Sequence, residues 1–178
     1  MEKSGFFNSS GGDRTYNAAD FAAYFGNLVS NGIFTKTADS LKVSAASGMN
    51  IQIQSGSAWI DGYCYENTEP LVMAVSTADG INPRIDRVVL RRSAVDRSIK
   101  LAIKPGAAAA SPSAPALTRN SDIHELGIAD IAVGRAVTGL AAGDITDTRL
   151  NGSLCGTVNS LVGAVYECIG GRLAETHI

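Results

Sequence analysis

The sequence predicts a mainly β domain, antiparallel and sandwich-like, with an N-terminal arm and helix and a C-terminal oligomerisation helix. Apolar and polar residues alternate over residues 49–75, turn dipeptides separate short apolar runs, and helical spacing occurs only near the two ends. The 178 residues are 45% hydrophobic, which is enough for one domain with a core and a short appendage. We divide the chain into an arm over 1–16, a helix plus β domain over 17–150, and a coiled-coil-like helix over 151–178.

The N-terminal arm is rich in Gly, Ser and Asn, so it cannot form a core, but its aromatic residues can lie on a neighbouring surface. Asn17 is placed as the N-cap of a helix, with Asp20 in the first turn and Gly32 at its end. We expect the aromatic side of this helix to pack on the domain's own sheet; the alternative is docking on another subunit. The predicted docking arm and helix contain Phe6, Phe7, Tyr16, Phe21, Tyr24 and Phe25.

The β region begins with alternation at Met49, Ile51 and Ile53, which is typical of a strand with one solvated face. Asp61-Gly62 lies between two short apolar runs and predicts a tight hairpin, because both residue types tolerate positive φ. Residues 71–75 alternate again. A second hairpin is predicted from 84–94 and 97–104, around Val95-Asp96.

The second half of the β region contains a proline- and alanine-rich stretch over 105–115, which predicts an extended connection across the surface. Residues 122–133 fit either a strand with one bulge or a short helix. Asp144, Asp147 and Arg149 are expected to form a turn held by charge-assisted hydrogen bonds.

The C-terminal segment has apolar residues separated by four, three, four and three positions, a spacing that predicts a helix-association seam. Glycines on the opposite side each cost about 1 kcal/mol of helix propensity, so a lone helix would be marginal and would need partners. Valine at heptad positions a with leucine at position d favours a two-stranded coiled coil. The alternative is a helix that folds back on its own domain. The predicted seam contains Leu154, Val158, Leu161, Val165 and Cys168.

Composition excludes several classes of partner. The net charge of −2 provides no field for binding nucleic acid. Arginines between Arg84 and Arg97 alternate with Asp86 and Asp96, which predicts ion pairs across a hairpin, such as Asp86 with Arg91. The three cysteines are widely separated and are expected to be buried free thiols. No signal peptide or membrane-spanning run is found, so we expect synthesis and assembly in a cytoplasm without membrane insertion.

Catalytic and metal-binding patterns are not found in the sequence. His124 and His177 do not belong to a triad, and the second histidine of an H-E-x-x-H motif is replaced by Ile128. No cofactor motif occurs, and we therefore expect a protein that is not an enzyme and binds neither cofactor nor metal. The alternative function is a carbohydrate-binding module that contacts host-surface saccharides through stacking and hydrogen bonds. Its predicted patch contains Trp59, Asp61, Tyr63 and Tyr65.

Several segments, taken in order, resemble a known family. They are D-R-T-Y-N-A-A-D-F-A-A-Y-F over 13–25, S-G-M-N-I-Q-I-Q-S-G-S-A-W-I-D-G-Y-C-Y-E-N over 47–67, D-G-I-N-P-R-I-D-R-V-V-L-R-R over 79–92, I-K-P-G over 103–106, S-P-S-A-P-A-L-T-R over 111–119 and I-T-D-T-R-L over 145–150. Their joint order and spacing are similar to the N-terminal attachment module of tail-fibre and upper-baseplate proteins of tailed bacteriophages.

The resemblance implies a structural virion protein that docks at the distal baseplate and scaffolds attachment of fibre or receptor-binding components. It implies a homotrimer, whereas the heptads favour a two-stranded coiled coil. It also implies a β-strand over 122–133. The implied partners are other copies of the chain, baseplate or tail proteins, and a receptor-binding protein. The implied location is the tail of a virion or phage-like particle that is assembled in the host bacterial cytoplasm. Many relatives continue into a receptor-binding head, whereas this sequence ends at Ile178.

Overall fold

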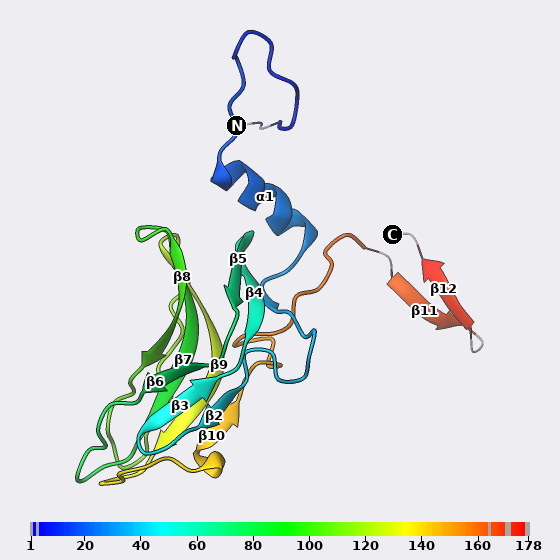
Figure 1. The fold of residues 1–178 in the computed structure, drawn as a ribbon. Helices are drawn as coiled ribbons and strands as arrows, with labels where there is room; N and C mark the ends of the chain where they lie inside the picture. Colours follow the sequence, from blue (N-terminus) through cyan, green and yellow to red (C-terminus); the bar gives the residue numbers. More distant parts are fainter. Residues whose placement is uncertain (1, 3, 164, 170–171, 177–178) are drawn as a thin grey trace.

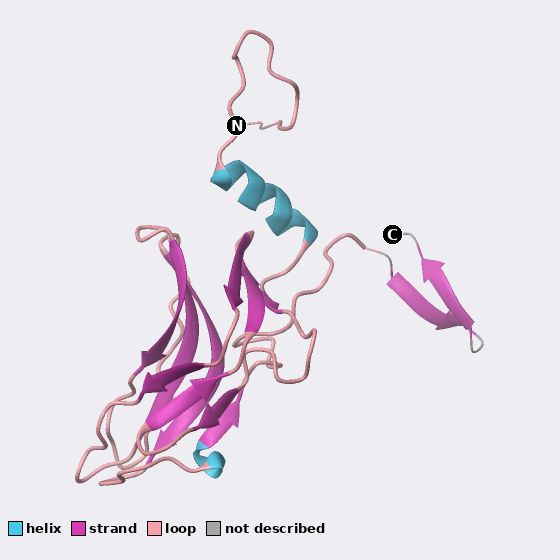
Figure 2. Ribbon diagram, viewed as in Figure 1, coloured by secondary structure: helices cyan, strands magenta, loops and turns pink. Residues whose placement is uncertain are grey.

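The computed structural model describes residues 2, 4–163, 165–169 and 172–176, and this part of the chain is mainly β, with antiparallel sheets and one α-helix (Figures 1 and 2). The prediction of a mainly β, antiparallel protein is therefore confirmed. The largest sheet has four strands in the order β10-β9-β7-β8. Its strands are β7 (Arg84–Ser93), β8 (Ser98–Lys104), β9 (Ile123–Val133) and β10 (Ile145–Asp147).

Two three-stranded sheets accompany it, in the orders β2-β3-β6 and β1-β4-β5. Their strands are β1 (Gly32–Ile33), β2 (Val43–Ala45), β3 (Asn50–Ile53), β4 (Gly56–Ile60), β5 (Tyr63–Asn67) and β6 (Leu71–Ala74). The α-helix is α1 (Ala18–Leu28), and a short 3-10 helix, η1 (Ala142–Asp144), precedes β10.

The two predicted hairpins are both present. Asp61 and Gly62 connect β4 to β5 with φ angles of 51° and 80°, as a tight turn with two left-handed central residues requires. Residues 94–97 connect β7 to β8. In β3, Ile51 and Ile53 are buried while their polar neighbours are not, so the predicted alternation is also confirmed.

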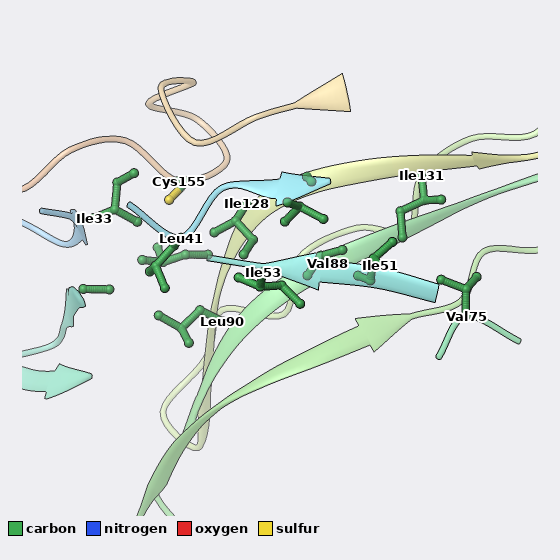
Figure 3. Packing of buried hydrophobic residues seen from close by; sticks show 14 of the residues in the cluster. Ile33, Leu41, Ile51, Ile53, Val75, Val88, Leu90, Ile128, Ile131 and Cys155 are labelled. Carbon is green, nitrogen blue, oxygen red and sulfur yellow. The ribbon is translucent and has the colours of Figure 1, made fainter. Parts of the chain in front are cut away.

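One hydrophobic core joins the sheets. Side chains of β3 lie against side chains of β7 and β9, as Figure 3 shows for Ile51, Ile53 and Val88. Ile33 of β1 and Ile60 of β4 enter the same cluster and are fully buried. The two smaller sheets thus share one core with the four-stranded sheet.

The cysteines lie in different surroundings. Cys155 is buried in the core, and this burial raises the pKa of its thiol to about 12. Cys64 is exposed on β5, so the expectation of a buried thiol is confirmed for Cys155 and wrong for Cys64. The side chain of Cys168 lies outside the described residues.

Residues 123–133 form a continuous strand, β9, which settles the choice between strand and helix. The pairing of β9 with β7 shifts register between Val88 and Val89, where Val88 faces Ala129 and Val89 faces Gly127. Ile128 is therefore an extra residue on β9, as a β-bulge requires. The predicted bulge is present.

The arginines of β7 form ion pairs, as predicted, but with other partners. Carboxylates from β9, from the β4–β5 turn and from β7 itself provide the negative charges, so the expected pairing across the β7–β8 hairpin is wrong. Asp86 does not pair with Arg91. The four pairs are Arg84 with Asp86 at 2.9 Å, Arg87 with Asp130 at 2.6 Å, Arg91 with Glu125 at 2.6 Å, and Arg92 with Asp61 at 2.8 Å.

The connection between β8 and β9 is extended, as its prolines predict, and it is fastened to the sheet by charged side chains. Arg87 donates to the carbonyl of Pro115, and Lys104 donates to the carbonyl of Ala116. Glu125 Oε2 accepts the backbone N–H of Thr118. Charged side chains of β7, β8 and β9 thus hold the last part of this connection, residues 115–118, against the sheet.

The turn after β10 is held by charge-assisted hydrogen bonds, which confirms the prediction for Asp147 and Arg149. Asp144 belongs instead to η1, where its carboxylate accepts the N–H of Ala141. Arg149 Nε and Nη2 donate to the carboxylate of Asp147, and these bonds lower the pKa of Asp147 below its usual value. Arg149 Nη1 also donates to the carbonyls of Ala38 and Ser40. A single guanidinium therefore joins the end of the β region to the loop before β2.

The C-terminal segment differs from the predicted helix. Residues 151–163 are turns and extended backbone, and β11 (Val165–Ile169) pairs with β12 (Arg172–Thr176) as an antiparallel hairpin. Gly156 has a φ of 82°, a left-handed conformation that a helix does not allow. Residues such as Val165, Tyr166 and Ile169 favour strands. Local β propensity and glycine thus outweigh the heptad spacing.

Glu125 provides a test of the ion-pair network. Burial acts to raise the pKa of Glu125, but hydrogen bonds from Lys104, Thr118 and Arg91 outweigh it and lower that pKa. We expect Glu125→Gln to reduce the free energy of unfolding at pH 7 by about 2 kcal/mol, because the charge-assisted hydrogen bonds from the partly exposed Arg91 and Lys104 lose their buried carboxylate.

Since the folded-state pKa of Glu125 lies below its unfolded value of about 4.3, its contribution is present above that pH and is lost as pH falls through the folded-state pKa. Urea unfolding at decreasing pH should therefore show the difference between wild type and variant shrinking. Glu66→Gln, exposed on β5, is the matched control. Equal destabilisation by both substitutions would contradict the network.

Candidate functional site

Helix α1 begins where the sequence predicts. Asn17 Oδ1 accepts the backbone N–H groups of Ala19 and Asp20, and Asp20 Oδ2 accepts the N–H of Asn17 at 2.9 Å. This reciprocal capping box confirms the predicted N-cap. The helix ends at Leu28, earlier than the predicted stop at Gly32, which instead belongs to β1.

The aromatic side of α1 packs on the domain's own sheets through Phe25, whose ring lies 5.6 Å from that of Trp59 on β4. Figure 1 shows the helix extending from one end of the β region. Phe21, Tyr24 and Phe25 are 46%, 47% and 40% exposed, and the only buried residue of the helix is Ala22. The expectation that this stripe packs on the sheet therefore holds for Phe25, whereas Phe21 and Tyr24 pack on Phe6 of the arm instead. Ala22 lies against the β4–β5 turn.

The arm folds back on the helix and orders its aromatic side chains. The ring of Phe6 lies 5.6 Å from Tyr16, 5.7 Å from Phe21 and 4.9 Å from Tyr24. The Tyr16 hydroxyl donates to the carbonyl of Phe7 and accepts its N–H, which closes the arm into a loop. Five of the six predicted residues thus form one cluster of rings, and the ring of Phe7 lies beside it, 5.4 Å from the guanidinium carbon of Arg14. The segment that holds them, residues 4–28, is here called the aromatic unit.

The aromatic unit rests on the β4–β5 turn. A Cβ atom at Gly62 would overlap the carbonyl oxygen of Ala22, so glycine is required for this close approach as well as for its φ of 80°. Beside the turn, the ring of Phe25 meets Trp59 edge to face at 5.6 Å. Trp59 Nε1 is buried and has no hydrogen-bond acceptor among the described residues.

Asp61 holds this turn in place. Asn31 accepts the backbone N–H of Asp61 at 2.7 Å and donates to its carboxylate at 3.2 Å. Arg92 Nε and His124 Nδ1 lie 2.8 Å and 2.9 Å from the same carboxylate. Asn31 lies just before β1, Arg92 in β7 and His124 in β9. The Asp61 side chain therefore joins the β4–β5 turn, on which α1 rests, to the four-stranded sheet. Local sequence spacing could not have identified these partners, because they lie 30, 31 and 63 residues away.

The predicted saccharide patch is not brought together on one surface. Trp59 pairs with Cys64, whereas Tyr63 pairs with Ile60 and Tyr65 with Ala58. Paired residues point to the same face, so Trp59 lies on the face opposite to the two tyrosines. Tyr65 packs on the core, and this burial raises its pKa. Asp61 is occupied by its structural partners.

The predicted oligomerisation seam is likewise dispersed. The carbonyl of Leu154 accepts the N–H of Gly127, and the N–H of Val158 donates to the carbonyl of Ile33, so both residues lie along the β region. Leu161 is 55% exposed. Val165 and Cys168 belong to β11, and their side chains lie outside the described residues.

The contact between α1 and the β4–β5 turn can be tested with the fluorescence of Trp59, the single tryptophan of the sequence. We expect Gly62→Ala to separate α1 from the β4–β5 turn and to shift Trp59 fluorescence to the red, because the new Cβ overlaps Ala22. Gly80→Ala is the control, since open space surrounds Gly80. Unchanged emission in Gly62→Ala, with the same melting temperature as wild type, would contradict the proposed contact.

No three His, Cys, Asp or Glu side chains in the described ranges form a group that could hold a metal ion. In that same part of the chain, no helix has the length and apolar character needed to cross a membrane. Comparison with protein-family models, curated proteins and solved structures finds no match to this chain. The ordered and exposed aromatic unit is therefore the surface from which a function is inferred.

Proposed function

We propose that this protein is a non-enzymatic structural component of the tail of a phage or phage-like particle. In this proposal it docks at the distal baseplate through the aromatic unit and scaffolds the attachment of fibre or receptor-binding components. It is assembled in the cytoplasm of the host bacterium. The observation that carries the proposal is the aromatic unit, an ordered cluster that leaves large apolar side chains in solvent.

Exposed aromatic clusters are typical of protein-binding surfaces. Phe6 and Phe7 are 50% and 59% exposed, in addition to the three aromatic residues of α1. Tryptophan and tyrosine are enriched among the residues that dominate binding energies, and large aromatic side chains in general contribute much buried area. Because contacts within the unit already order these side chains, less conformational entropy is lost when a partner covers them.

The β region suits a part that must transmit load. Its core is shared by three sheets, and its buried arginines are paired with carboxylates. We propose that it acts as a sandwich-like attachment module. The segments that resemble the phage family fall on its successive elements: residues 13–25 on the arm and α1, 47–67 on β3 to β5, and 79–92 on β7. The family proposal depends on the order of these segments along the chain, because the comparisons find no match.

Self-association as a homotrimer belongs to the same proposal, but it cannot depend on the heptad seam. Light scattering on the full chain measures the oligomeric mass directly. The second function considered, a carbohydrate-binding module whose patch combines Trp59 and Asp61 with Tyr63 and Tyr65, is not favoured, because Trp59 lies on the face opposite to the two tyrosines.

Substitutions on the exposed face of the aromatic unit test docking. We expect Phe7→Ser and Phe21→Ser to fold normally but to reduce incorporation into purified tail particles by about tenfold or more, as loss of a central aromatic contact does. Deletion of residues 1–12 should have the same effect. Quantitative mass spectrometry of particles compares each variant with total expressed protein.

The control is Val72→Ser, because Val72 is 57% exposed on β6, outside the aromatic unit. Melting curves confirm that all variants fold. Normal incorporation of both phenylalanine variants and of the deletion variant would contradict docking through this unit. An equal loss in Val72→Ser would show that the effect is not specific to it.

A further inference from the structure

A cleft of about 380 Å³ lies between the first residues of β5 and the turn that joins β7 to β8. Ala18, the first residue of α1, closes one side. Its volume is within the range of small-molecule sites, which span roughly 300–1,000 Å³. Ala18 belongs to the aromatic unit, but none of the exposed aromatic side chains that the docking proposal uses lines the cleft.

The cleft is lined by two cationic side chains. Arg92 and Arg97 line it, and no carboxylate does. The two arginines differ in what they already bind. Arg92 is fixed by its ion pair with Asp61 and by a hydrogen bond to the carbonyl of Ser121. In the described part of the chain, Arg97 makes neither an ion pair nor a side-chain hydrogen bond.

The backbone at Arg97 is unusual, with a φ of 50° in a residue that is not glycine. This left-handed conformation places the arginine in the β7–β8 turn at the cleft. A guanidinium has five N–H donors arranged in a planar fork, which matches the paired oxygens of a carboxylate or phosphate. Because Asp61 neutralises Arg92, Arg97 is the lining residue that brings available positive charge to the cleft.

The remaining walls combine apolar and hydroxyl groups. Tyr63, Ala94 and Ile99 contribute apolar surface, and Ser93 and Ser98 contribute hydroxyls. Apolar walls with a few polar groups are the usual composition of a ligand site, in which the polar groups fix orientation. An exposed aromatic ring beside hydroxyl donors suits a compact ring that carries hydroxyl groups of its own.

We propose that this cleft binds a small oxyanion, either a carboxylate or a phosphate, carried by a compact ring such as a hexose. Arg97 forms the charge-assisted hydrogen bonds to the anion, Arg92 borders the anion from the position that its ion pair with Asp61 fixes, and Tyr63 packs against the ring. This inference goes beyond tail attachment and does not depend on it.

Binding is tested by titrating the full-length, isotope-labelled protein with glucuronate, glucose 6-phosphate and neutral glucose, and following backbone amide resonances. We expect at least one anion to shift the resonances of Ser98 and Ile99 with a Kd of about 1 mM or lower. Glucose should produce no shift at the same concentration. The tighter of the two anions identifies the source as carboxylate or phosphate.

Two matched variants assign the interaction. Arg97→Gln should weaken binding of the anion by about tenfold or more, as expected for loss of a charge-assisted hydrogen bond. Lys100→Gln removes an equal charge from an exposed position on β8, the strand that follows the turn of Arg97, and should leave the affinity unchanged. The resonance pattern of each free variant verifies its fold.

Three results would overturn the proposal. The first is no shift with either anion up to about 20 mM, well above the expected Kd. The second is equal binding of glucose and the anions, which would remove the role of charge. The third is unchanged affinity in Arg97→Gln, which would place the anion elsewhere. Loss of particle incorporation with intact anion binding would bear on the docking proposal alone.

Discussion

Burial of strand β7 constrains the structure, because this central strand carries four arginines that form ion pairs. A guanidinium can leave water only when a carboxylate or carbonyl takes its place. Arg87 and Arg91 meet acidic residues of β9, and Arg92 meets the β4–β5 turn. The groups that neutralise the arginines of β7 therefore fix the positions of β9, of the extended β8–β9 connection and of the β4–β5 turn. The apolar side chains of β7 fill the core.

This arrangement links the body to the proposed docking surface. Asp61 neutralises Arg92 and, in the same turn, holds the seat on which α1 rests. The aromatic unit adds its own order through rings packed on Phe6. A rigid body with an ordered, exposed cluster at one end is what a load-bearing connector needs, since docking then costs little entropy and force passes through paired strands. The oxyanion cleft adjoins the same turn but uses Arg97, which the fold leaves available.

Local patterns in the sequence predicted much of the fold. Asn17 with Asp20, Asp61-Gly62 and the β9 bulge depend on neighbouring residues, and each was confirmed. The partners of charged residues were not predictable, because Asp61 and His124 are 63 residues apart. The aromatic spacing of α1 indicated an apolar face but not what covers it. The C-terminal heptads were misleading, because the same residues also have high strand propensity and lie among glycines.

Electron microscopy of particles from a producing strain tests the central claim most directly. Gold-labelled antibodies raised against the β region should mark the distal end of the tail in intact particles, in a fixed number of positions. Parallel mass spectrometry of the purified particles should detect the chain as a stoichiometric component. Protein that remains entirely in the soluble cell fraction, with particles that are complete and unlabelled, would contradict a structural role in the tail.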